Sequence, residues 1–310
     1  MKHTLLAAAV AGLACTGAFA QSTVSIYGRL NVTAERQDEN GKSITKLVNN
    51  SSRIGFRGTE DLGGGVKAGF VLEHGFNADT GTPSGAFWGR QSELNLAGNF
   101  GMVRLGNFTS EAYFATADYI SMHNHDTGTS SDALYAYIGR NINKVAYRLP
   151  ALGGLSVELA TSLKEAAADN TYDVAANYAA GPLQLGFGYE KNGKANQFAI
   201  RGLYEMGSVI LGAYVQRDEN GWGANLGDRT TFRLSAALNM GATEFHANIG
   251  RAGDYSKLNG SDATQWTLGV NQNLSKRTKV YAFYTRVDDD KKLYTGGDFS
   301  SLAVGLRHNF

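Results

Sequence analysis

Basic residues recur with the period of a β-strand in the first half of the chain. Successive side chains of a strand point to opposite faces, so residues two apart share a face. In these segments the basic side chains fall on the polar face, opposite an apolar one. They are Arg29, Arg53, Arg57, Lys67, Arg104, Arg140, Lys144 and Arg148, and the acidic residues on the same faces are Glu73 and Glu93. Such a wall acts on solutes through its electric field, without making or breaking bonds.

A long segment from Phe108 to Gly139 supplies the opposite charge. It has no strand pattern and is rich in aromatic residues. Loops of this length in compact domains are usually functional or disordered, and its aromatic content argues against a solvated linker. We predict that it folds into the interior of a barrel as a constriction loop; a long surface loop is the alternative. Its carboxylates are Glu111, Asp118, Asp126 and Asp132.

The sequence gives little support for metal binding or catalysis. The trio His123, His125 and Asp126 lacks the ordered spacing of a zinc site, and no G-x-S-x-G elbow is present. We therefore expect no catalytic residues, no bound metal and no cofactor.

The first twenty residues have the pattern of a secretory signal peptide. Lys2 precedes an apolar run from Leu5 to Ala14, and the segment ends in small residues, so cleavage is expected before Gln21. A lipoprotein acylated at Cys15 is the weaker alternative. Removal of residues 1–20 leaves a chain, 21–310, without cysteine and with 28 basic and 28 acidic residues. This balance gives no reason to expect a nucleic-acid partner.

The mature chain reads as many short strands joined by turns. It is rich in glycine, with 39, and poor in proline, with 3, a composition that suits strands and tight turns. Seven short turns alternate with eight longer polar stretches, the first of which is Ala34 to Ser51, and the count predicts an all-β fold of sixteen antiparallel strands. A barrel of that size is too wide for side chains to fill. Its polar face must line water and its apolar face must meet lipid.

Two details of the strand pattern complete the prediction. The last strand, Ser300 to Phe310, must pair with the first, Val24 to Thr33, to leave no exposed edge. Arg90 falls on the apolar face with Leu94 and Leu96. We expect Arg90 to lie above the lipid band or beside a bulge.

At this point the sequence resembles the general-diffusion porins of beta-proteobacteria and Neisseria, a Gram-negative porin family. The resemblance runs from one end of the chain to the other and is carried by several motifs. These are Val24-Ser25-Ile26-Tyr27-Gly28, Ser52-Arg53-Ile54-Gly55-Phe56-Arg57-Gly58-Thr59-Glu60-Asp61-Leu62-Gly63-Gly64-Gly65, Gly89-Arg90-Gln91, Asn273-Leu274-Ser275-Lys276-Arg277-Thr278, and Val304-Gly305-Leu306-Arg307-His308-Asn309-Phe310.

The resemblance implies a homotrimer of sixteen-stranded barrels in the outer membrane of a Gram-negative bacterium. It implies arginines beside the constriction at Arg53 and Arg140, and a role for Phe310 in the signal read by the barrel-assembly machinery. Lipid and lipopolysaccharide would surround the barrel, and small ions and hydrophilic solutes would pass through it. Asn107 stands where the family often has an arginine.

From the excess of basic over acidic residues on the polar faces we expect moderate anion preference. One alternative is a substrate-selective porin, in which Tyr113, Phe114 and Tyr119 of the loop would stack on a solute. A barrel enzyme is a weaker alternative.

Overall fold

The computed structural model describes residues 23–118, 120, 132–165 and 169–310. The predicted signal peptide, Tyr119 and the trio His123, His125 and Asp126 therefore lie outside the described residues. Among the described residues, no helix is long and apolar enough to cross a membrane.

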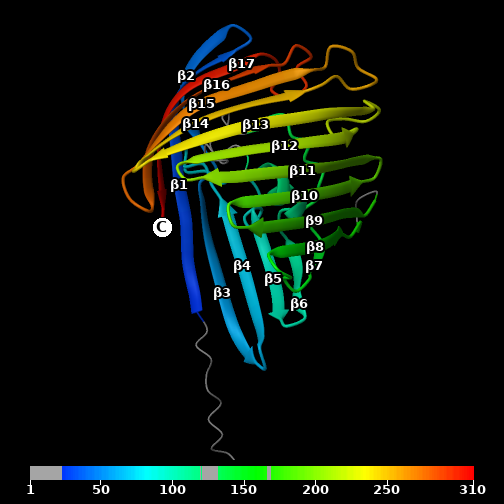
Figure 1. Ribbon diagram of the computed structural model, residues 1–310. Helices are drawn as coiled ribbons and strands as arrows, with labels where there is room; N and C mark the ends of the chain where they lie inside the picture. Colours follow the sequence, from blue (N-terminus) through cyan, green and yellow to red (C-terminus); the bar gives the residue numbers. More distant parts are fainter. Residues whose placement is uncertain (1–22, 119, 121–131, 166–168) are drawn as a thin grey trace, which may run out of the picture.

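The described chain forms one closed antiparallel sheet (Figure 1). The strands of its first half are β1 (Thr23–Glu39), β2 (Lys42–Asn49), β3 (Arg53–Gly63), β4 (Val66–Gly75), β5 (Gln91–Gly98), β6 (Gly101–Asn107), β7 (Lys144–Arg148), β8 (Leu155–Ser162) and β9 (Thr171–Ala180). Those of its second half are β10 (Leu183–Asn192), β11 (Ala195–Met206), β12 (Val209–Glu219), β13 (Asp228–Met240), β14 (Thr243–Ala252), β15 (Ala263–Asn273), β16 (Thr278–Asp288) and β17 (Phe299–Asn309).

Strands β2 and β3 together make one wall strand, so the barrel is sixteen-stranded as the sequence predicted. Both pair with the long β1, β2 opposite its second half and β3 opposite its first. Between the pairs Val32↔Asn49 and Arg29↔Arg53 the β2–β3 side has one residue more than β1. The extra residue makes a β-bulge, in which Ser51 has a φ of 58°.

The prediction of a polar loop over Ala34 to Ser51 was wrong. This stretch is a β-hairpin in which β1 and β2 pair as far as Glu39↔Lys42. Asn40 and Gly41 connect the two strands with φ of 52° and 80°. Positive φ at both central residues is what a two-residue hairpin turn of matching twist requires, and Asn-Gly is its preferred sequence. The polar side chains that suggested a loop belong to a hairpin.

Closure of the barrel follows the predicted pairing of its ends. β1 pairs with β17 from Arg29↔Asn309 to Glu39↔Phe299. The terminal Phe310 then exchanges two backbone hydrogen bonds with Gly28, at 3.0 and 3.1 Å. A side chain at Gly28 would collide with the ring of Phe310. The small size of Gly28 therefore makes room for the last residue of the same chain.

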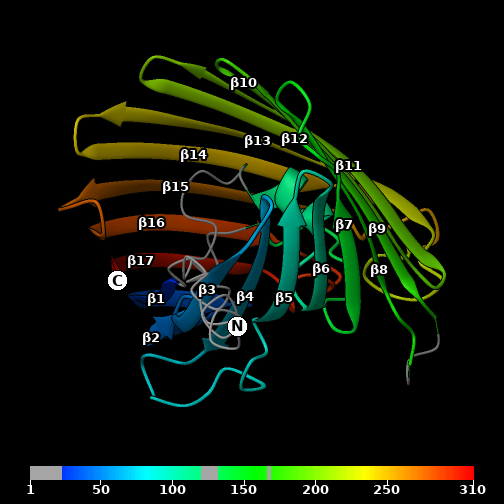
Figure 2. The ribbon, with the colours of Figure 1, turned by 90° about the horizontal axis from the view of Figure 1, so that it is seen from below.

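The two faces of the sheet have opposite composition. Polar side chains such as Gln197, Gln216 and Thr267 are buried, whereas many leucines, among them Leu234 and Leu302, are more than half exposed. This inverts the distribution of a water-soluble protein. The inner face of this sheet, whose strands Figure 2 shows from below, carries the polar side chains, and its outer face is apolar.

The segment between β6 and β7 contains the short helical turns α2 (Glu111–Tyr113) and η2 (Phe114–Asp118). The hydroxyl of Ser110 accepts a hydrogen bond from the Ala112 amide at 3.2 Å and so caps α2. Both turns contact β9 and β10, and η2 also contacts β11.

Candidate functional site: the charged inner wall

Residues 132–138, in the C-terminal part of the segment 108–139, are fixed to the polar face of the second half of the barrel. Residues 132–138 cross several wall strands, whose side chains bind their backbone. Gln216 of β12 binds both the amide and the carbonyl of Ala136, each at 2.9 Å. The Ala133 amide donates to Gln265 of β15 at 2.9 Å, and Asn192 of β10 donates to the Ile138 carbonyl at 3.0 Å. Wall amides thus satisfy backbone groups that no neighbouring strand pairs.

The helical turns of the segment pack on a glycine surface of β10. A Cβ added at Gly186 would overlap the carbonyl oxygen of Ala115, and one at Gly188 would approach the carbonyl of Ala112 to 2.5 Å. Only residues without side chains allow the two backbones this approach. The segment and the wall are therefore matched in shape as well as in hydrogen bonding.

Aromatic rings form the internal core of this segment. Tyr113 packs edge-on against Tyr135 at 5.7 Å and against Tyr137 at 5.1 Å between ring centroids, and also contacts Phe114. The hydroxyls of Tyr135 and Thr116 are 2.7 Å apart. The rings that suggested a solute-stacking track are used for packing within the segment, and Tyr119 lies outside the described residues.

Three of the eight predicted basic residues are neutralised by carboxylates of the wall. Arg104 donates bidentately to Glu93, at 2.8 and 3.0 Å, and also to Glu158 at 2.9 Å. Arg148 donates to the same Glu158 at 2.9 Å. Lys144 is buried, and its Nζ lies 3.0 Å from Asp173. Buried guanidinium groups need such partners to offset the loss of hydration. The first-half wall therefore has less net charge than a count of its basic residues suggests.

The loop carboxylates are paired as well. Glu111 accepts a hydrogen bond from Arg148 at 2.8 Å. Asp132 accepts one from Arg233 of β13 at 3.0 Å and another from Tyr214. Asp118 belongs to η2, close enough to Tyr113 to act on its ionisation. Glu111 and Asp132 attach the segment to the wall and are compensated there.

Burial affects the acidity of Glu111. Loss of hydration raises the pKa of its carboxyl above the ordinary glutamate value, and the nearby charge of Arg148 only partly opposes this. Glu111 therefore titrates in less acidic solution than an exposed glutamate.

Four arginines gather where the barrel closes, and we call them the arginine cluster: Arg29 of β1, Arg53 of β3, Arg90 before β5, and Arg307 of β17. The charges of the other three act on Arg29, and the carboxylate of Glu73 acts on Arg29 and Arg53 with the opposite sign. Arg90 donates to Glu73 at 2.6 Å. Alternation put Arg90 on the apolar face, but Arg90 precedes β5 and its guanidinium turns to the inner carboxylate of Glu73.

Three other predicted basic residues contact backbone carbonyls, an aromatic ring or a facing aspartate. Arg140 donates to the carbonyls of Ser162 and Leu163, at 2.6 and 3.0 Å. Arg57 lies over the ring of Tyr27, 5.1 Å from its centroid, and Lys67 is exposed beside Asp61 in the β3–β4 pairing.

Sequence reasoning missed the basic residues of the second half of the wall. Arg201, Arg229, Arg233, Lys279 and Arg307 share faces with buried polar residues. The period-two pattern that identified the first eight applies equally to these five. Arg229 binds Asp218 at 2.7 Å and the Leu134 carbonyl at 2.8 Å, so it helps to anchor the segment.

Comparison with known proteins agrees with this architecture. Residues 6–292 match the family model described as Gram-negative porin. The chain is 32% identical over its full length to the full-length outer membrane porin protein 32 of Delftia acidovorans. It is 27% identical, again over both full chains, to a major outer membrane protein P.IB of Neisseria meningitidis.

Two solved structures are similar to this chain in fold. The anion-selective porin from Comamonas acidovorans superposes with a TM-score of 0.77 at 25% identity, covering 94% of this chain and all of that one. A trimer form of OmpT from Vibrio cholerae, at 16% identity and a TM-score of 0.71, shares the fold over 93% of this chain and 99% of its own. The chain belongs to the Gram-negative porin family and forms a diffusion channel in the outer membrane.

Proposed function

We propose that this channel prefers small anions, and that the arginine cluster sets the preference. The supporting observation is the uneven distribution of positive charge around the lumen. Arg104, Lys144 and Arg148 lie beside carboxylates, whereas at the closure of the barrel the like charges of Arg53, Arg90 and Arg307 act on Arg29. The similar porin from Comamonas acidovorans is described as anion-selective, which agrees with the proposal.

A rough magnitude follows from Coulomb's law. One charge about 5 Å from a passing ion, in surroundings as polar as water, changes the energy of that ion by about 0.8 kcal/mol. This corresponds to about a fourfold change in local chloride concentration. Screening over about 8 Å at physiological salt confines the effect to the neighbourhood of the cluster.

The reversal potential in a potassium chloride gradient across a planar bilayer tests this proposal. The unmodified channel should pass chloride in preference to potassium, and Arg53→Gln should reduce that preference. Lys276→Gln, which removes a charge in a short turn outside the lumen, is the matched control and should leave the potential unchanged. A potassium preference in the unmodified channel, or equal effects of the two substitutions, would contradict the proposal.

We also propose that residues 1–20 are a cleaved signal peptide, that the mature protein is a homotrimer, and that Phe310 forms part of its assembly signal. The measured mass of the mature protein is expected to be that of a chain that begins at Gln21.

The trimer is supported by an exposed aromatic group on the outer face of β3 and β4. Phe87, 64% exposed, stacks on His74 with ring centroids 4.5 Å apart and packs edge-on against Trp88.

A further inference from the structure

Arg229 is the second residue of β13, directly after the long loop 220–227, and lies on the inner face of the wall. Its side chain is fully buried, and so is that of Asp218 opposite it on β12. The guanidinium Nε donates to Asp218 at 2.7 Å. This bond leaves the two terminal nitrogens, Nη1 and Nη2, to donate to other parts of the chain.

The two terminal nitrogens bind different segments. Nη2 donates at 2.8 Å to the carbonyl of Leu134, in the segment between β6 and β7. Nη1 donates to the hydroxyl of Tyr294, in the long loop 289–298. That hydroxyl donates in turn to the carbonyl of Ser261, in the long loop 253–262, at 3.0 Å. One side chain thus connects the wall, the segment and two outer loops.

Three aromatic rings surround the same guanidinium, and we call them the aromatic cage. The Cζ atom of Arg229 lies 4.9 Å from the ring centroid of Tyr294, 5.0 Å from that of Tyr255 and 5.9 Å from that of Trp222. Cation–π contacts of this length are attractive, and more so away from water. Trp222 belongs to the loop 220–227, so each of the three long loops between β12 and β17 contributes one ring.

Further contacts fix the rings of the cage. The hydroxyl of Tyr255 donates to Asp218. Asp289 accepts a hydrogen bond from the Tyr294 amide at 2.8 Å, and Trp222 packs edge-on against Tyr294 with ring centroids 5.0 Å apart. The cage therefore holds the guanidinium in the orientation in which it reaches the Leu134 carbonyl.

The side chain of Leu134 is buried against the same part of the wall. It packs on four residues at the long-loop ends of β14 to β17, which are Ala252, Ala263, Val287 and Phe299. Because the wall blocks movement outwards, this part of the segment can leave its position only towards the lumen.

We propose that Arg229 is a positioning residue for the pore. With the aromatic cage it couples the three outer loops to residues 132–138, so the width of the lumen depends on these loops as well as on the wall. Loss of the contact lets residues 132–138 move towards the lumen and partly close it. The proposal rests on the prediction that the segment narrows the pore, and it is independent of the anion preference.

Single-channel recording in planar bilayers tests the role of Arg229. Arg229→Lys keeps the charge beside Asp218 but lacks the planar group that reaches three partners at once. It should raise the frequency of partial closures at least about tenfold. A tenfold change corresponds to about 1.4 kcal/mol, which is close to the contribution of one hydrogen bond to a charged group.

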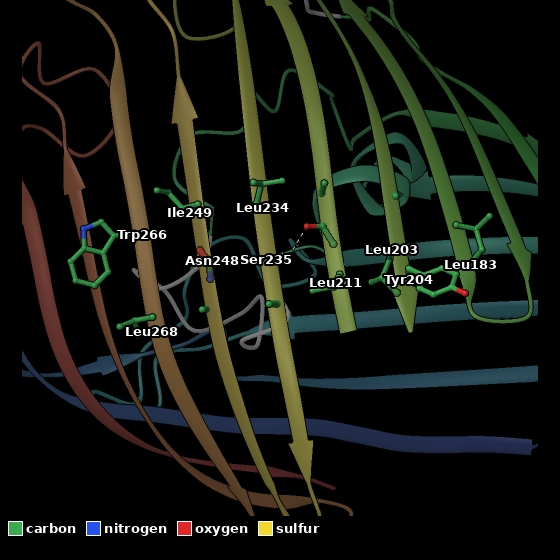
Figure 3. A pocket seen from close by; sticks show the side chains of 15 residues that line it. Leu183, Leu203, Tyr204, Leu211, Leu234, Ser235, Asn248, Ile249, Trp266 and Leu268 are labelled. Carbon is green, nitrogen blue, oxygen red and sulfur yellow. Dashed lines mark hydrogen bonds between the residues drawn. The ribbon is translucent and has the colours of Figure 1, made fainter. Parts of the chain in front are cut away.

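Arg217→Lys is the matched control, on the outer face of β12. Arg217 is half exposed and pairs with Asp228 outside the lumen. Further along the strands the same outer face is apolar, where Leu211 and Leu234 line a hollow (Figure 3). The control should leave the frequency of closures unchanged.

Tyr294→Phe is a milder variant that decides the question if Arg229→Lys does not assemble. It keeps the ring and every charge, and removes only the hydroxyl that joins Arg229 to Ser261. The frequency of partial closures should rise about fivefold, as expected for the loss of one hydrogen bond.

An engineered disulfide separates positioning from a general loss of stability. A Cβ added at Gly221 would lie 2.7 Å from the Cβ of Ala136, about 1 Å closer than in a disulfide, so a small displacement allows the bond. Residues 21–310 contain no cysteine. Gly221→Cys with Ala136→Cys, added to Arg229→Lys, should return the closures to the unmodified frequency when oxidised and raise them again when reduced.

Two results would overturn the proposal. One is a closure frequency in Arg229→Lys equal to that of the unmodified channel, and the other is a disulfide that has no effect on the closures of this variant. Gly186→Ala acts on η2, at the other part of the same segment. If Gly186→Ala alters the conductance and Arg229→Lys does not, the segment narrows the pore but Arg229 does not position it.

Discussion

Among single residues, Glu111 connects the protonation state of the loop to the charge of the lumen. It accepts from Arg148, and that arginine also binds Glu158. Protonation of Glu111 would leave the same arginine with less compensation, so the lumen would become more positive. The raised pKa of Glu111 places this change at milder acidity than for an exposed glutamate.

We therefore predict that anion preference increases on mild acidification, as pH falls through the raised pKa of Glu111. The sign follows from the loss of one negative charge near Arg148. Glu111→Gln should show the higher preference already at neutral pH and should lack this step. The reversal potential measured as a function of pH in both proteins checks the prediction. An identical pH profile in the variant would assign the step to another group.

At the scale of elements, the short helical turns α2 and η2 depend on the glycines of β10. Neither turn has the length to be stable alone, since short helices in water are marginal. Their position comes from contact with β9 and β10 and from the backbone of residues 132–138, which wall side chains hold. The predicted constriction loop therefore depends on the wall strands for its position.

We predict that Gly186→Ala displaces η2 from β10. The new methyl group would overlap the Ala115 carbonyl, and overpacking of this kind costs about 1–3 kcal/mol. The expected results are a lower thermal denaturation temperature and an altered single-channel conductance. Gly202→Ala is the matched control, because its Cβ would meet only Leu185, at 3.9 Å. If both variants conduct like the unmodified channel, the packing of η2 does not affect the pore.

At the scale of the whole molecule, the outer surface has two unlike faces. Outward lysine or arginine residues lie near the long-loop ends of β10, β12, β14, β16 and β1, and the exposed ring of Phe87 lies elsewhere, against His74 of β4. The outward glycines Gly28 and Gly58 are not open to a second barrel, because the ring of Phe310 lies against Gly28 and that of Phe70 against Gly58, within the same chain.

We predict that the trimer contact includes Phe87. Phe87→Ser should shift the mass of the protein in detergent from trimer towards monomer, because it removes an aromatic group from a desolvated contact. Phe198→Ser, an outward substitution on β11, should leave the trimer intact. Light scattering on the purified proteins measures both. A monomeric unmodified protein would show that there is no trimer contact. Dissociation by Phe198→Ser alone would place the contact elsewhere on the barrel.

The sequence determined the barrel, the polarity of its two faces and its closure, because these depend on local alternation of side chains. Period two alone put Arg29, Arg53 and Arg104 on one face, and the pairing of β1 with β17 followed from the need to leave no open edge. The same local rule failed at Asn40 and Gly41, where a polar composition concealed a hairpin.

Only the tertiary structure decided which charges compensate one another. Arg104 and Glu158 are 54 residues apart, and Asp132 and Arg233 are 101 apart. No local pattern relates such pairs, because their distance depends on the strand register and on where the segment 132–138 crosses the wall. The arginine cluster has the same origin: closure brings Arg307 beside Arg29 and Arg53, which alternation alone assigns to a face but not to a neighbour.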